Sequence, residues 1–363
     1  MRAVELLPAN RNRSLKTIAW QWLQTAHGLP GTLLALIPAL LPMLFLACSP
    51  VAPPEEDLTL FRIGGFSREP ASLIADKKGF LQEEGLRMEY TRVNSSFELM
   101  QGFVDGKFEV IHTNADNIIA WAEGQGLDRT PHDFVIFMGG RKGLLQRLVV
   151  GPEIQSFDDL KGKTLAVDAY NTGYAPVLVY MLKQEGLTLE QDYEMKSVGG
   201  GRLRRDAVKR GEAVGGFMSL DEELEQRGFY LLARSDTYIT SYSRGVGAAR
   251  RSWAEQNEEL LVRYIRAMVR ATDWLLDPQN EAEAIAVFRS ENPESPEQAE
   301  EIYEEALDPQ FGVIPRAAVE RDGIQTILEI REVMGEMEAP LPSPEKYVDE
   351  RYHQEAIASL GGG

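Results

Sequence analysis

The stretch SFDDLKGKTLAVD at residues 156–168, followed by AYNTGY at residues 169–174, decides the fold. Its Gly162 favours a turn, TLAVD is an apolar run of strand length, and the polar loop that follows leads into a helix expected over residues 175–185. A strand, a polar loop and a helix in this order are typical of α/β proteins. The stretch therefore predicts a parallel strand with helices packed on its sheet.

The same alternation of strand-like and helical runs continues on both sides of this unit. Upstream we expect strands at residues 58–66, 87–93, 108–113, 134–138 and 144–150, and helices at 70–84, 97–105 and 117–123. Downstream we expect strands at residues 195–198, 214–218 and 230–233, and helices at 203–210, 255–276, 281–290 and 296–306. Two α/β series followed by a largely helical tail are thus predicted.

Length and composition indicate an ordinary folded protein. The chain has 363 residues, of which 44% are hydrophobic and 26% charged, and about 150 residues make one domain, so two domains are expected. The formal net charge is -18. A protein this acidic would repel nucleic-acid phosphates, and we therefore expect no nucleic-acid partner.

The amino-terminal segment has the layout of an export signal. Basic residues at positions 11, 13 and 16 precede an uncharged, apolar run at residues 29–47. The run ends in LFLAC at residues 44–48, which resembles the lipobox of bacterial lipoproteins. Cys48 is the single cysteine of the chain and stands where a lipobox places the acylated residue.

We therefore predict a signal peptide at residues 1–47 and a tether at residues 48–57. Acyl chains on Cys48 would hold the mature protein on a lipid bilayer. The alternatives are a retained membrane-spanning helix, which the three prolines of the apolar run would disturb, and a chance cysteine.

Several segments together resemble one family, the nitrate, sulfonate, taurine and thiamine-precursor binding proteins of ABC importers. They are FRIGGFSREPAS at residues 61–72, KKGFLQEEGL at 77–86, SFDDLKGKTLAVD at 156–168, GEAVGGFMSLDEEL at 211–224 and the helical run at 253–285. The resemblance rests on their order and spacing, and it covers the chain after the tether.

The resemblance implies an α/β, two-lobed periplasmic-binding-protein-like (type II) fold. In it two doubly wound mixed sheets enclose a ligand cleft, and a helical carboxyl-terminal tail follows. Lobe I would comprise residues 58–146 and 245–345, lobe II residues 147–244, and the tail residues 346–363. Two crossing segments, at about 143–151 and 235–247, would join the lobes. The resemblance also implies a monomer outside the cytoplasmic membrane that works with an ABC permease and an ATPase, without a cofactor.

Candidate ligand-binding residues follow the expected strands, because open α/β sheets bind ligands beyond the carboxyl ends of their strands. They are Phe66, Ser67, Arg68, Ser95, Asn114, Asn117, Arg141, Tyr170, Asn171, Thr172, Gly173, Tyr174, Gly200 and Ser219. Tyr170 and Tyr174 offer flat faces to a solute. Arg68 and Arg141 could each grip an anion with two hydrogen bonds.

Each assignment has a purely structural alternative. Ser95 and Ser219 both satisfy the capping-box spacing, with a glutamate three residues later. Asn171 and Thr172 could also be helix caps, and Arg68 and Arg141 could be solvated. The basic residues on the expected helix at 203–210, Arg204 among them, are interpreted as a solvated face. His112 is expected in the core or the wall of the cleft.

The sequence argues against two other functions. Yeast-type thiamine-pyrimidine synthases share the fold that the resemblance implies, but that family uses a cysteine-rich segment and an active-site histidine, whereas the single cysteine here is Cys48. A ligand-sensing domain of a transcription factor would need a helix-turn-helix where this chain has an export signal. No serine-hydrolase or zinc-protease motif is present either. The sequence therefore predicts a solute-binding protein that is not an enzyme and needs no metal.

Overall fold

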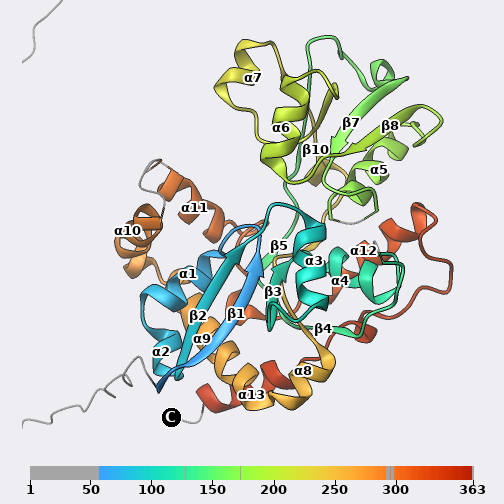
Figure 1. The fold of residues 1–363 in the computed structure, drawn as a ribbon. Helices are drawn as coiled ribbons and strands as arrows, with labels where there is room; N and C mark the ends of the chain where they lie inside the picture. The colour runs from blue at the N-terminus through green and yellow to red at the C-terminus, as the bar shows by residue number, and fades with distance from the viewer. Residues whose placement is uncertain (1–56, 127, 172, 292–294, 296–297, 362–363) are drawn as a thin grey trace, which may run out of the picture. The chain divides into compact units, whose positions relative to one another are not determined.

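The computed structural model describes residues 57–126, 128–171, 173–291, 295 and 298–361. Cys48 and Thr172 lie outside these residues, as do the predicted signal peptide and nearly all of the tether. The described strands form two five-stranded sheets and one two-stranded ribbon (Figure 1).

The first sheet has the strand order β2-β1-β3-β12-β4. Its strands are β1 (Thr59–Gly65), β2 (Leu86–Arg92), β3 (Val110–Thr113), β4 (Phe134–Met138) and β12 (Val246–Arg250). The first three run parallel, and β12 lies antiparallel between β3 and β4. The sheet is therefore mixed, and it draws strands from two distant parts of the chain.

The second sheet has the order β10-β6-β9-β7-β8. Its strands are β6 (Arg147–Val150), β7 (Lys163–Val167), β8 (Tyr193–Ser197), β9 (Gly215–Phe217) and β10 (Tyr230–Arg234). β7 pairs in parallel with β8 and β9, whereas β6 is antiparallel to its neighbours β9 and β10.

The chain passes between the two sheets beside the short antiparallel ribbon of β5 (Arg141–Lys142) and β11 (Ser243–Arg244). Ser235 joins the two crossing segments by hydrogen bonds. Its Oγ donates to the Leu144 carbonyl at 2.8 Å and accepts from the Gln146 amide at 2.7 Å. The connection is therefore narrow and hydrogen-bonded.

Helices cover both sheets. Those before the first crossing are α1 (Pro70–Lys77), α2 (Phe80–Glu83), α3 (Ser96–Val104) and α4 (Ala115–Ala122); those of the second series are α5 (Ala175–Gln184), α6 (Gly201–Lys209) and α7 (Glu222–Gln226). The carboxyl-terminal part contributes α8 (Arg251–Gln256), α9 (Glu258–Leu276), α10 (Glu281–Glu291), α11 (Gln298–Leu307), α12 (Arg321–Val333) and α13 (Arg351–Leu360). None of the described helices is long and apolar enough to cross a membrane.

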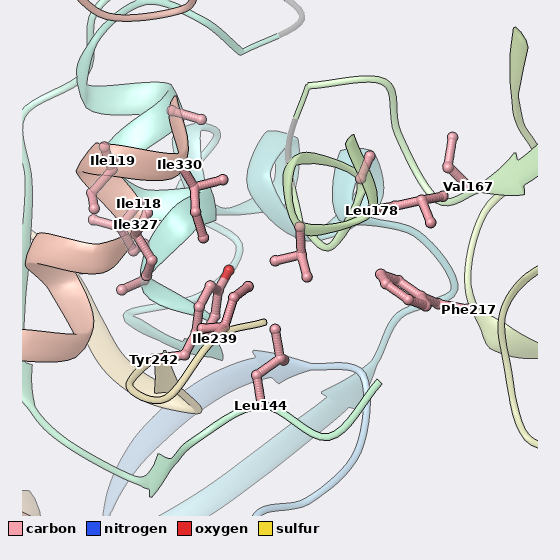
Figure 2. Packing of buried hydrophobic residues seen from close by; sticks show 14 of the residues in the cluster. Ile118, Ile119, Leu144, Val167, Leu178, Phe217, Ile239, Tyr242, Ile327 and Ile330 are labelled. Atoms are coloured by element: carbon pink, nitrogen blue, oxygen red, sulfur yellow. The ribbon is translucent and has the colours of Figure 1, made fainter. Parts of the chain in front are cut away.

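The apolar core divides into clusters on the two faces of the first sheet. One cluster packs α1, α9 and α13 against it, with Phe61 and Tyr264 stacked at 4.5 Å between ring centres. The other begins on the opposite face with α3 and α4 and continues through α12 into α5 and the second sheet. Figure 2 shows this continuity in Ile118 of α4, Ile327 of α12 and Leu178 of α5. Hydrophobic packing therefore joins the two α/β series beside the ribbon.

Several expected elements differ in the structure. The helix expected at residues 70–84 breaks at Gly79, whose φ of +79° is left-handed. The helix expected at 255–276 is α8 and α9, divided at Asn257. Residues 246–250 form β12 rather than an irregular lead into helices, and α12 and α13 were not predicted.

His112, on β3, is buried as expected, and its Nε2 lies 2.8 Å from the Tyr264 hydroxyl. Burial lowers the pKa of His112 below its ordinary value, although the nearby Glu69 opposes this. Below a pH of about 6.5, His112 is protonated in the unfolded chain, whereas in the folded chain its lowered pKa keeps it neutral. The free energy of unfolding should therefore fall as the pH drops below that value.

His112→Gln should make this acid dependence shallower, as measured by urea unfolding between pH 7 and pH 5. His353→Gln, on the last helix, is the matched control and should keep the wild-type slope. If the free energy of unfolding depended on pH equally in the wild type and in His112→Gln, His112 would not be the source of the acid dependence.

Candidate functional site

A groove of about 1270 Å³ lies between the loops that follow β2, β7 and β8. β2 and β8 are each the end strand of their sheet. The chain crosses between the sheets next to β4 and β6, which lie toward the other end of each sheet. The groove thus lies among loops of both sheets and apart from the ribbon, none of whose residues line it. Typical small-molecule pockets measure roughly 300–1,000 Å³, so the groove has room for a solute of that class.

Three of the predicted residues line this groove: Ser95, Tyr170 and Asn171. The Ser95 Oγ accepts from the Glu98 amide at 3.1 Å and caps α3, which confirms its expected structural role. The Asn171 Nδ2 donates to the Gln125 carbonyl at 2.7 Å, across the junction. Tyr170 is 57% exposed. Ser95 and Asn171 thus have structural roles, one as a helix cap and the other as a contact across the junction, in addition to any ligand role.

Asn114, Asn117 and Gly173 meet beside the inner end of the groove. Asn114 caps α4 by accepting from the Asn117 amide at 3.2 Å. Gly173 has φ +70°, and the position that a Cβ would take there lies 3.5 Å from the Ser96 Oγ. The loop after β7 therefore lies beside the start of α3, and the left-handed backbone at Gly173 favours glycine there.

Tyr174 and Arg141 lie on the ribbon side of the same junction. The Tyr174 hydroxyl is hydrogen-bonded to Asn114, and burial raises the pKa of Tyr174 above its ordinary value, so the phenol stays protonated. The Arg141 Nε lies 2.9 Å from the Glu69 Oε2, and its Nη1 lies 3.1 Å from the Glu305 Oε1. This guanidinium therefore already has two carboxylate partners.

Arg68 is paired in the same way. Its Nη2 lies 2.9 Å from the Asp76 Oδ2 and its Nη1 lies 3.5 Å from the Glu291 Oε1. Its guanidinium also lies over the ring of Tyr90, 5.7 Å from the ring centre. The Arg68 side chain is therefore mostly buried, and an anionic ligand would have to compete with two carboxylates for it.

The remaining predicted residues are distributed around the junction. Phe66 is partly buried against the larger apolar cluster, and Ser67 is exposed. The Gly200 amide donates to the Asn94 carbonyl at 3.2 Å, which links the loops after β8 and β2. Ser219 is exposed, and the capping role considered for it is wrong, because Asp221 caps α7.

Arg204 corrects a second interpretation, because it is buried rather than solvated. Its Nε donates to the Phe217 carbonyl at 2.7 Å and its Nη1 to the Gly199 carbonyl at 3.2 Å. It ties the end of β9 to the loop after β8, and so supports the groove from below.

Two further residues of the junction were not predicted from the sequence. Asp168 follows β7 directly, and its Oδ2 accepts from the Ser96 hydroxyl and, at 3.3 Å, from the Ser96 amide. Arg331 of α12 is fully buried; its Nη1 lies 2.6 Å from the Asp116 Oδ1 and 3.1 Å from the Asn171 carbonyl. Asp168 had a detectable signal, since it is a charged residue at the carboxyl end of a strand.

Arg331→Met should lower the free energy of unfolding by roughly 3–5 kcal/mol, because it leaves the Asp116 carboxylate buried without its partner. The double variant Arg331→Met, Asp116→Leu removes both charges and should recover much of that loss. Urea unfolding measures both values. A double variant as unstable as the single one would show that the pair is not what matters.

The described residues contain no group of three or more His, Cys, Asp or Glu side chains that could hold a metal ion. The geometry offers a groove between loops of the two sheets, lined by loop backbones, the partly buried carboxylate of Asp168 and exposed aromatic rings.

Solved structures share this fold. The nitrate-binding protein NrtA from Synechocystis PCC 6803 matches with a TM-score of 0.65 and 16% identity, over 84% of this chain and 89% of that chain. The alkanesulfonate-binding protein SsuA from Xanthomonas axonopodis pv. citri, bound to MOPS, matches with 0.62 and 15%, over 80% and 98%. A Candida albicans protein with the generic periplasmic binding protein fold matches with 0.63 and 15%, over 81% and 97%.

These likenesses confirm the expected periplasmic-binding-protein fold. A search of curated protein sequences finds no match. The family model described as NMT1/THI5 like matches residues 71–282, which is more than half of the chain. The chain belongs to the NMT1/THI5-like family.

Proposed function

We propose that this protein captures a small solute in the groove between its two sheets and passes it to an ABC importer, without changing it chemically. One observation carries the proposal. The loops that line the groove come from the carboxyl ends of strands in both sheets, while the sheets are joined at the far side by a short ribbon. Such a junction can open and close around a solute.

The contacts across the junction indicate how closure is held. Ser96 donates a hydrogen bond to Asp168, the Gly200 amide to the Asn94 carbonyl, and Asn171 to the Gln125 carbonyl. All of them join polar loop groups rather than core side chains, so water can replace them when the groove opens. Ser235 and the ribbon stay hydrogen-bonded throughout and act as the hinge.

The fold neighbours support a choice of solute classes. Two of them are named for binding nitrate and alkanesulfonate. For this chain we propose a sulfonate, nitrate, a carboxylate or a pyrimidine as the classes to test first. Tyr170 is the predicted ligand contact that we favour, because it lines the groove and is exposed. Lobe boundaries near residues 146 and 245 fit the positions of the strands.

The same proposal places the protein outside the cytoplasmic membrane as a lipid-anchored monomer. Cys48 and the apolar run before it support this placement. An ABC permease and its ATPase would be the partners. A synthase is the weaker alternative, because that reaction in the family that the sequence resembles uses a cysteine-rich segment, and Cys48 stands beside the proposed export signal.

A thermal-unfolding screen of the full-length chain tests solute capture. A true ligand at 100 times its dissociation constant should stabilise the protein by about 2.7 kcal/mol. We expect a shift with a member of one solute class and none with its reagent blank. Turnover of an added pyrimidine or pyridoxal compound, without any such shift, would refute capture and favour the synthase.

Lipid anchoring is tested by Cys48→Ser. In bacterial cells the wild-type chain should incorporate labelled fatty acid and sediment with membranes, whereas Cys48→Ser should incorporate none. Ser49→Ala, one residue later, is the matched control and should behave as the wild type. Labelling of Cys48→Ser at the wild-type level would rule out this anchor.

A further inference from the structure

At the inner end of the groove, one carboxylate oxygen and one neighbouring amide oxygen have no hydrogen-bond donor among the residues that the structure describes. Asp168 lines the groove, and its Oδ1 is buried and has no partner among the residues that the structure describes. Beside it, Asn117 is 1% exposed; its Nδ2 donates to the Thr113 Oγ1 at 2.7 Å, and its Oδ1 likewise has no partner among those residues. A buried acceptor without a donor costs free energy, so the Asp168 Oδ1, which belongs to a lining residue of the groove, favours a ligand that brings one.

Asp168, Ser96 and Asn117 lie close together at this end of the groove. The position that a Cβ would take on Gly173 lies 3.5 Å from the Ser96 Oγ, 3.8 Å from the Asp168 Oδ2 and 3.9 Å from the Asn117 Oδ1. Because the Asp168 Oδ2 already accepts from Ser96, the Oδ1 is the oxygen to which an N–H group of a ligand could donate. A sulfonate or nitrate there would face a carboxylate instead, which electrostatic repulsion opposes.

The nearby guanidinium groups do not reverse this preference. Arg68 and Arg141 are each paired with two carboxylates. Arg204 keeps its positive charge near Asp168, but its Nε and Nη1 donate to main-chain carbonyls and are not free to bind an anion. The anion grip that the sequence suggested for Arg68 and Arg141 would therefore have to displace existing ion pairs.

The walls of the groove are apolar and aromatic. Phe97 of α3 is 49% exposed and Tyr170, after β7, is 57% exposed; both line the groove, one from each sheet's loops. Val179, Leu187 and Met195 extend the apolar wall. Exposed aromatic rings suit a flat apolar body, and their faces also attract cations.

Charge along the groove points the same way. Besides Asp168, the lining carboxylates are Glu190, Glu194 and Glu336, against the cations Arg129 and Lys183. The Lys183 Nζ already donates to the Val333 carbonyl at 2.9 Å. With a net charge of -18 on the whole chain, the long-range field also draws cations toward the protein.

From these observations we infer that the groove selects an organic cation or N–H donor, such as an amine or amidine, joined to a flat aromatic or aliphatic body. The donor binds Asp168, and the body lies between Phe97 and Tyr170. This inference rests on the proposed capture function and narrows its solute class. It disfavours simple anions as the natural ligand.

Isothermal titration of the full-length chain with three probes of one body tests the inference: phenethylamine, 2-phenylethanol and 2-phenylethanesulfonate. The amine should bind at least about tenfold more tightly than the other two. Asp168→Asn should weaken the amine by about tenfold or more, without changing the alcohol, because a good charge-assisted hydrogen bond is worth about 1.5–3 kcal/mol.

Two further variants separate charge from packing. Asp158→Asn makes the same chemical change in the same α/β series, on a side chain that is 83% exposed and outside the groove, and it should leave all affinities unchanged. Tyr170→Leu should weaken the amine and the alcohol alike. Thermal unfolding of each variant checks that it is folded.

The inference fails if the sulfonate binds more tightly than the amine, or if folded Asp168→Asn binds the amine as the wild type does. Binding of nitrate, a sulfonate or a carboxylate in the screen above, without amine binding, would overturn the inference and leave the capture function standing. Absence of binding by every probe in both experiments would overturn both.

Discussion

Arg331 is a fully buried cation whose partners come from three separate segments of the chain. Asp116 belongs to α4, Gln125 follows α4, and Asn171 belongs to the loop after β7. A charge in such a place is tolerated only when its hydrogen bonds are satisfied. The position of α12 is therefore fixed against both α/β series at once, and the loop that lines the groove is fixed with it.

Hydrophobic packing reinforces the same arrangement. The cluster in Figure 2 places Ile327 and Ile330 of α12 against Ile118 of α4 and Leu178 of α5. Burial of such side chains contributes roughly 1.5–3 kcal/mol each. At the groove, by contrast, polar contacts such as that between Ser96 and Asp168 join the loops of the two sheets.

Most strands were predictable because their residues are β-branched or apolar runs bounded by turns. β4 occupies the predicted residues 134–138, whereas β12 was not predicted because its sequence, VGAAR, has little strand character. Its small residues answer a steric need: a Cβ on Gly247 would lie 2.6 Å from the Met138 Cγ. The propensity of a segment cannot reveal a narrow slot that distant residues create.

The same limit applies to α12 and to the site. Gly323 in its first turn weakens the helix signal, but a Cβ there would lie 2.4 Å from the Ser243 amide nitrogen. The rule that ligands bind beyond strand ends located the loops after β2 and β7, including Ser95 and Tyr170. It could not show that Arg204 would be buried, because that depends on carbonyl groups brought to it by the fold.

The distance along the chain between Arg331 and its partners has a consequence for biosynthesis. Asp116 precedes Arg331 by 215 residues, and Asn171 precedes it by 160. Because chains are made and begin to fold from the amino terminus, both α/β series exist before the cation that aligns them. A truncated chain that stops short of α12 would thus hold Asp116 without a counter-charge, and the complete fold is assembled only when almost the whole chain has emerged from the ribosome.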